Sequence, residues 1–256
     1  MTTSASAVTS KPATAALPAL PYKSNYEVAI NFFKEKAKDV AKLVNYSFGW
    51  AAQVYPNNPT LPSVSKGAKD VKNYLSIVEI PEKTDKTVAS VRKFFEKPSV
   101  TTGRAVLKEA TGFTNSLCDG VDFSNNWLQM PSHVMKGLGL VNSGATILGC
   151  GNSAIEQAEF IHCEIKKKWE GEKFNGSLIP LNLIRIARDV SYIAVAVLGI
   201  IAVGFGAAIA PWAFLACLTS ALVFSIGEFF YANIVDPEGK NYDKEKRIAQ
   251  LESRIA

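Results

Sequence analysis

Cysteine and histidine are scarce in this chain of 256 residues, which holds four cysteines and two histidines. No two cysteines have the C-x-x-C spacing of common zinc sites, and only His133 and His162 could complete a ligand set. A long chain with so few cysteines is also a poor match for a disulfide framework. We therefore expect no metal or other cofactor, and thiols that are buried or face a membrane. The cysteines are Cys118, Cys150, Cys163 and Cys217.

A strong charge imbalance is missing as well, because the formal net charge is +5 and the pI is about 8.9. Such a weak excess does not indicate a nucleic-acid partner, but it suits an anionic surface such as a membrane leaflet. Residues 1–23 are rich in Ser, Thr, Ala and Pro and have no apolar stretch of the signal-peptide kind. With so few large apolar side chains, we predict a disordered leader there.

Strand-like alternation of apolar and polar residues is nearly absent. Apolar side chains instead recur every three or four residues in four stretches that end at Pro56, Pro81, Pro98 and Pro131. This spacing predicts amphipathic helices that pack on one another. We therefore predict an all-α fold with a helical module over residues 24–180.

Charge is absent from residues 190–227, which form the longest apolar run of the chain. One membrane span needs about 20 apolar residues, so this run is long enough for two. The turn would lie at Gly204, Gly206 and Pro211, which disfavour a continuous helix. We predict a two-span transmembrane hairpin over residues 181–235; the alternative is a buried helical hairpin of a soluble protein.

Basic residues flank this run on both sides, with Arg185 and Arg188 before it and Lys240 and Lys244 after it. The predicted turn carries no charge. Basic residues stay on the cytoplasmic side of a membrane, so we expect both chain ends in the cytosol. Residues 236–256 are predicted to form a short charged helix.

A glycine motif, Gly149-x-Gly151-x-x-Ala154, follows a short apolar run and resembles the turn of a dinucleotide-binding fold. That fold also needs a second strand about 20 residues later, with Asp or Glu at its end. Here a lysine run and a turn follow instead. A dinucleotide-binding oxidoreductase is therefore the least favoured alternative.

The glycines of this region allow another interpretation. Gly137, Gly144 and Gly151 recur every seven residues, and small side chains on one helix face let two helices approach closely. We predict a small-residue helix over residues 137–165, buried or lying at the membrane, whose glycine face packs against another helix or forms a homo-oligomer. Asn142 and Asn152 argue against a complete lipid-facing span.

No catalytic constellation stands out. Glu156 and Glu159 share a helix face, which is common for solvated carboxylates, and Asp119 and Asp122 lack the spacing of a calcium loop. His162 has no evident partner. We expect a protein without enzyme activity.

The Ser/Thr-rich leader at residues 2–14 and the two-lobed apolar hairpin at residues 190–231 together resemble the chlamydial inclusion membrane proteins. The resemblance is one of layout, and the large helical region before the hairpin departs from the usual pattern. It implies an effector secreted by a type III system, inserted into a vacuole membrane, with its soluble part displayed to the host cytosol.

Three short segments resemble the peroxisome-elongation peroxins: Lys36–Trp50, Val91–Pro98 and Ile184–Val195. In that family, amphipathic helices enter one leaflet and bend the membrane, as such helices can do in general. The sequence thus predicts an integral protein of a vacuole or organelle membrane. Its helical module would bind a host or self protein partner, or shape the bilayer.

Overall fold

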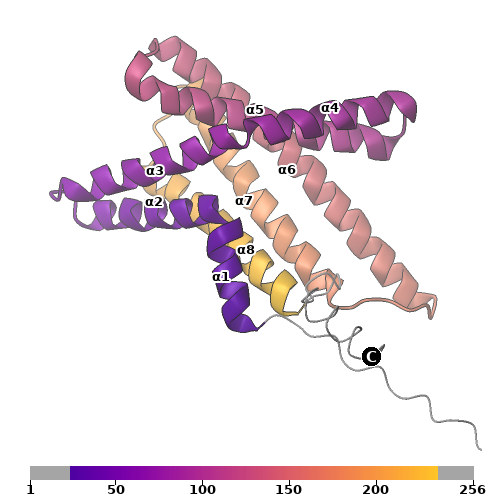
Figure 1. The fold of residues 1–256 in the computed structure, drawn as a ribbon. Coiled ribbons are helices and arrows are strands. Elements are labelled where there is room, and N and C mark those ends of the chain that lie inside the picture. The colour runs from indigo at the N-terminus through magenta and orange to yellow at the C-terminus, as the bar shows by residue number, and fades with distance from the viewer. Residues whose placement is uncertain (1–23, 236–256) are drawn as a thin grey trace, which may run out of the picture.

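The computed structural model describes residues 24–235, and these residues form helices joined by short turns, with no strand among them (Figure 1). The predicted all-α fold is confirmed for this part of the chain. The leader, Lys240, Lys244 and the predicted helix at 236–256 lie outside the described residues. The helices are α1 (Asn25–Glu35), α2 (Ala37–Val54), α3 (Thr60–Val78), α4 (Ile80–Glu96), α5 (Val100–Leu128), α6 (Ser132–Trp169), α7 (Leu178–Gly204) and α8 (Pro211–Ile234).

Local sequence signals set several helix ends. Ser24 opens α1 with a capping box, in which its hydroxyl accepts from the Glu27 backbone N–H at 3.2 Å and the Glu27 carboxylate accepts from the Ser24 backbone N–H at 2.6 Å. Ser99 begins α5 in the same way with Thr102. Gln129 ends α5 in a left-handed conformation at φ 45°, just before Pro131.

The helices are arranged as antiparallel pairs that wrap around α7 and α8 (Figure 1). Helix α6 runs along one side of α7, and α2 crosses α8 at an angle on another. The turns α2–α3, α5–α6 and α7–α8 lie at one end of the molecule, on the left in Figure 1. We call this end the three-turn end and define it by residues 55–59, 129–131 and 205–210. Helix α4 and the start of α5 project from the opposite side as an arm.

The apolar core is small. Val28 and Phe32 of α1 pack against Phe229 of α8, with the Phe32 and Phe229 ring centroids 5.3 Å apart. Phe230 stacks on Phe32 at 5.4 Å. This cluster joins the first described helix to the last, close to where α8 ends.

Helix α6 is continuous over 38 residues and contains the whole glycine motif. Gly149 and Gly151 lie in the helix interior, so the strand and turn that a dinucleotide-binding fold needs do not exist there. The strand–turn–helix geometry on which that alternative depends is therefore not formed at this motif.

The predicted glycine face of α6 meets no other described helix of this chain. A Cβ placed on Gly137, Gly144 or Gly151 would meet nothing within 4 Å, so these glycines are not packed against another helix of this chain. The close approach occurs at Gly149 instead, where such a Cβ would lie 2.7 Å from Thr111 Oγ1 of α5. Within this chain, the helices that contact α6 lie on a different side of it from the seven-residue glycine repeat, and contact of that face with a second copy stays a prediction.

Candidate membrane interface

Helices α7 and α8 are the two described helices that are long and apolar enough to cross a membrane. Helix α7 has 27 residues and α8 has 24, which at about 1.5 Å per residue gives lengths of about 40 and 36 Å. The connection between them lies where the sequence predicted it. Gly204 ends α7, Gly206 adopts φ 66°, and Pro211 is the first residue of α8.

The surrounding helices leave much of this hairpin uncovered. Only 11% of the most apolar 18-residue stretch of α7 is buried, and 17% of that of α8. Large apolar side chains point outward along both helices, among them Leu183, Val190, Val197 and Val223. A hairpin in the core of a soluble protein would bury such side chains, so its outer face is suited to an apolar environment.

The interior of the bundle holds polar as well as apolar side chains. Many of the buried positions hold small or polar side chains, and several large apolar ones face outward. Small and polar side chains between helices are typical of helix bundles in lipid, where they allow close approach and join the helices by hydrogen bonds. The buried polar and charged residues are Asp39, Asn73, Ser76, Thr111, Ser116, Glu164, Asn182 and Asp189.

An ionic network joins α7 to α8 on the side away from the three-turn end. Arg185 Nε donates to Glu228 Oε1 at 2.8 Å, and Arg188 donates to the other oxygen of the same carboxylate. Arg188 also pairs with Asp189 at 2.8 Å, and Asp189 is almost completely buried. Two arginines and two acids therefore balance in charge across the hairpin.

This network changes the interpretation of the basic flank. Arg185 and Arg188, the predicted topology-setting flank, lie within α7 and are paired with acids, while their role in orienting the hairpin stays a prediction. The sequence alone did not reveal Glu228 as their partner. Arg188 and Glu228 lie at nearly equal distances along the chain from the α7–α8 connection, and this symmetry was the available signal.

A second polar link fastens α2 to the hairpin. Lys42 Nζ lies 3.1 Å from Asp39 Oδ1 and 3.0 Å from the Tyr192 hydroxyl of α7. Ser225 of α8 donates to the other Asp39 oxygen at 2.9 Å. Nearer the three-turn end, the Trp50 indole N–H donates to the Thr219 hydroxyl at 3.0 Å. Helix α2 thus contacts α8 both at Asp39 and at Trp50.

The remaining polar candidates from the sequence join helices outside the hairpin. Asp119 accepts from Lys72 at 2.6 Å and from the Ser76 hydroxyl at 2.8 Å, and Asp122 pairs with Lys69 at 2.8 Å. These contacts connect α3 to α5.

Of the two glutamates on α6, Glu159 pairs with Arg104 of α5. Glu159 therefore joins α6 to α5, as Asp119 and Asp122 join α5 to α3. Among the described residues, no group of three or more His, Cys, Asp or Glu could hold a metal ion.

A third ionic cluster lies at the junction of α3 and α4. Glu79 accepts from Lys38 at 2.6 Å and from Lys83 at 3.1 Å. Partial burial acts to raise the pKa of the Glu79 carboxyl, but the two ammonium groups hold that pKa below its usual value. Burial lowers the pKa of Lys38 more than its carboxylate partner raises it.

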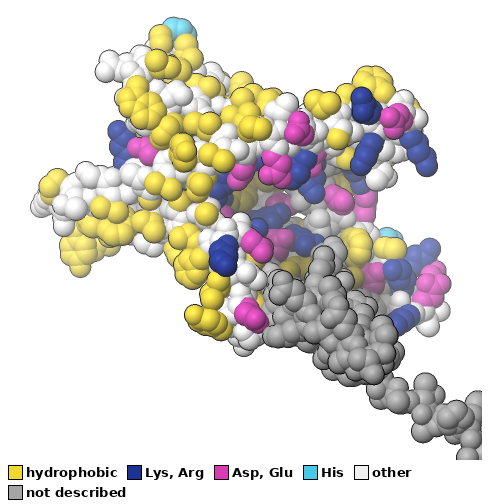
Figure 2. Space-filling view, viewed as in Figure 1, with side chains coloured by type: hydrophobic (Ala, Val, Ile, Leu, Met, Phe, Trp, Pro, Cys, Tyr) yellow, Lys and Arg dark blue, Asp and Glu magenta, His cyan; other side chains and the backbone are white. Residues whose placement is uncertain are grey.

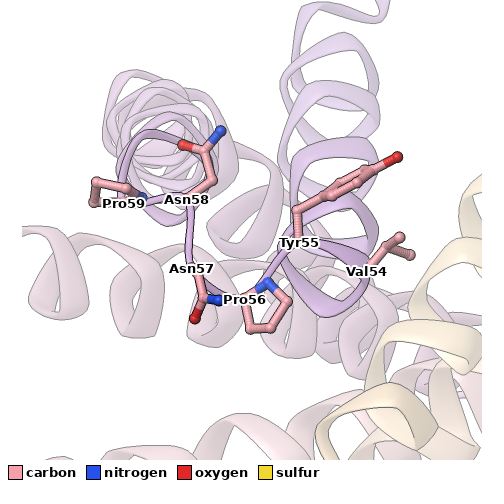
Figure 3. A pocket seen from close by; sticks show the side chains of 6 residues that line it. All are labelled: Val54, Tyr55, Pro56, Asn57, Asn58 and Pro59. Carbon is pink, nitrogen blue, oxygen red and sulfur yellow. The ribbon is translucent and has the colours of Figure 1, made fainter.

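The hollows on the described surface are shallow. One lies in the α2–α3 turn and is lined by uncharged residues, with the ring of Tyr55 pointing away from Pro59 (Figure 3). Its position at the three-turn end matters more than its volume. The lining residues are Val54, Tyr55, Pro56, Asn57, Asn58 and Pro59.

No protein-family model, curated protein or solved structure matches this chain. The case for a function therefore depends on the exposed apolar hairpin, the polar interior of the bundle and the distribution of charge.

Proposed function

We propose that this is an integral membrane protein in which α7 and α8 form a two-span hairpin. The observation that supports this most is the combination of a largely uncovered apolar hairpin with a bundle interior rich in polar side chains. In water such a surface would be costly, at roughly 25 cal/mol for each Å² of apolar area. In lipid the same surface needs no cover, and backbone groups are satisfied within each helix.

The ionic network marks where the hairpin leaves the hydrocarbon. Residues 190–204 and 211–227 contain no charged side chain, which at about 1.5 Å per residue corresponds to about 22 and 26 Å. These lengths fall slightly short of a hydrocarbon core of about 30 Å. The arginines and Glu228 then lie close to the headgroups, which long arginine side chains can reach.

The charged arm is the part displayed to the aqueous side. Helix α4 has no buried residue and, with the start of α5, carries many of the charged side chains on the right of Figure 2. Val88, Phe95 and Val100 are exposed among these charges. Such a mixture of apolar and charged groups suits a protein partner. We propose that the arm binds a host protein or another copy of this chain from the cytosolic side of a vacuole membrane, as an inclusion-type secreted effector would.

Membrane shaping is the second candidate function, as the resemblance to the peroxins implies. The specific observation is that α4 exposes Val88 and Phe95 beside Lys86, Arg92 and Lys93. A basic helix of this kind can lie in one leaflet. Tubulation of giant anionic vesicles by the purified chain, lost in Phe95→Asp, would support this role, whereas unchanged vesicles would favour partner binding.

The test of the membrane proposal is carbonate extraction of the full chain from cells, combined with protease access to tags at residues 2 and 256. We expect the protein to stay in the membrane pellet and both tags to be cleaved from the cytosol. Release by carbonate would contradict the membrane proposal. Protection of a single tag would contradict the two-span topology.

A further inference from the structure

In or directly beside each of the three turns at the three-turn end, two large apolar or aromatic side chains are exposed. Trp127 is 68% exposed and Trp212 is 58% exposed, and the other four are similarly accessible. Each turn also belongs to a long uncharged segment, namely residues 43–65, 123–135 and 190–227. The six side chains are Val54, Tyr55, Trp127, Leu128, Phe205 and Trp212.

Contacts between the helices place these turns at the same end. A Cβ on Gly49 would lie 3.4 Å from Leu215 Cδ1, which joins the last turns of α2 to the start of α8. A Cβ on Gly204 would lie 3.9 Å from Leu140 Cδ2, which places the start of α6 beside the end of α7. In Figure 2 this part of the surface is mainly hydrophobic and uncharged, whereas charge gathers toward the opposite side.

The charged residues near these turns have polar partners or long side chains. Asp70 accepts from the Asn126 amide at 3.1 Å, beside Trp127. Lys69 is paired with Asp122 at 2.8 Å, between α3 and α5. Lys66 and Lys136 are exposed, and their long side chains can reach phosphate headgroups while their stems stay in apolar surroundings. Trp and Tyr together with such lysines are typical of the boundary between lipid and water.

We propose that the α2–α3 and α5–α6 turns enter the same bilayer as the α7–α8 connection, so that lipid contacts all six side chains. This inference rests on the proposed membrane function of the hairpin. Helix α6 lies along α7, and the last turns of α2 lie beside the start of α8, so a bilayer around α7 and α8 also surrounds the ends of α2 and α6 at the three-turn end. The helical module is then embedded in part, rather than displayed as a whole in the cytosol.

Three of the four tryptophans of the chain provide the test, because two lie at the three-turn end and one lies at the far end of α6. Trp127 reports on the α5–α6 turn and Trp212 on the α7–α8 connection, while Trp169 is 84% exposed at the far end of α6 and serves as the control. Three full-length variants each keep one of these tryptophans, with the other three replaced by phenylalanine. They are reconstituted in phosphatidylcholine vesicles whose acyl chains carry bromine, and the quenching of emission is compared with that by aqueous iodide.

We expect Trp127 and Trp212 to lose most of their emission to brominated lipid and to resist iodide, and Trp169 to behave in the opposite way. If Trp212 is quenched by lipid but Trp127 by iodide, the inference is overturned while the hairpin proposal stands. If iodide quenches both, the membrane proposal fails too. A Trp127 that neither quencher reaches is covered by protein, which also overturns the inference.

A second measurement guards against misfolded variants. Trp127→Phe alone, in a chain that keeps the other three tryptophans, should remove a part of the emission that brominated lipid quenches. Trp169→Phe should leave that part unchanged. Equal loss in both variants would contradict lipid contact at Trp127.

Discussion

Replacing Val197 by arginine separates a membrane hairpin from a soluble one. Val197 lies on α7, midway between Asp189 and Gly204, and is 41% exposed. In a soluble protein an arginine at such a site points into water and changes stability by about 0.5 kcal/mol or less. In a bilayer the same side chain must either extend toward the distant headgroups or place its charge in the hydrocarbon.

The expected magnitude follows from this position. An arginine near the centre of a membrane helix costs about 2.5–3.5 kcal/mol in insertion experiments. At about 1.4 kcal/mol for each factor of ten, this is roughly a 60- to 300-fold shift away from insertion. Val88→Arg is the matched control, because Val88 is 61% exposed but lies on the charged arm.

The assay is the fraction of full-length protein that remains in the carbonate-resistant membrane pellet. We expect Val197→Arg to reduce this fraction strongly and Val88→Arg to leave it at the level of the original chain. Equal retention of both variants would refute the argument that Val197 faces lipid. Recovery of the original chain in the supernatant would refute the membrane proposal as a whole.

Three further predictions concern the packing of the bundle and its charges. Glu228→Gln should lower the unfolding free energy by about 1–3 kcal/mol, since Arg185 and Arg188 lose the negative charge of Glu228 at a site that is only partly exposed; a chemical unfolding curve in detergent measures this. Gly149→Ala should lower the melting temperature, because overpacking against α5 costs about 1–3 kcal/mol. Gly151→Ala is the control: it lies in open space and should leave the melting temperature unchanged or raise it. Equal effects of the two variants would contradict the observed contact between α5 and α6. The lysines beside Glu79 lower the pKa of its carboxyl, so its stabilising effect should be present above its ordinary pKa of 4.5 and disappear as the pH falls through its folded-state pKa. The difference in melting temperature between the original chain and Glu79→Gln should therefore shrink in acid.

The small apolar core and the polar contacts between helices bear on how the chain folds. Its one described apolar cluster of buried residues, around Val28, Phe32 and Phe229, is too small to gather eight helices in water. Polar contacts such as the Lys42 link between Asp39 and Tyr192 hold the helices together instead. Such contacts are most effective where water does not compete for them, which is consistent with folding in or at a membrane.

The sequence by itself determined the helices and the place of the hairpin. Apolar residues at helical spacing, prolines at the segment ends and the uncharged run at 190–227 act locally, so each can be interpreted without knowledge of its neighbours in space. For the same reason, the connection at Gly204, Gly206 and Pro211 lies where the sequence predicted it.

Tertiary structure alone decided which faces meet. Gly137, Gly144 and Gly151 share a helix face in the sequence, yet only the approach of α5 shows that Gly149 is the crowded position. The sequence shows Arg188 as part of a basic flank, and only the folded hairpin shows that Glu228 lies beside it. A helix repeat gives the direction of every side chain around its own axis, but not the side from which a partner approaches, because that depends on crossing angles and on contacts between residues far apart in the chain.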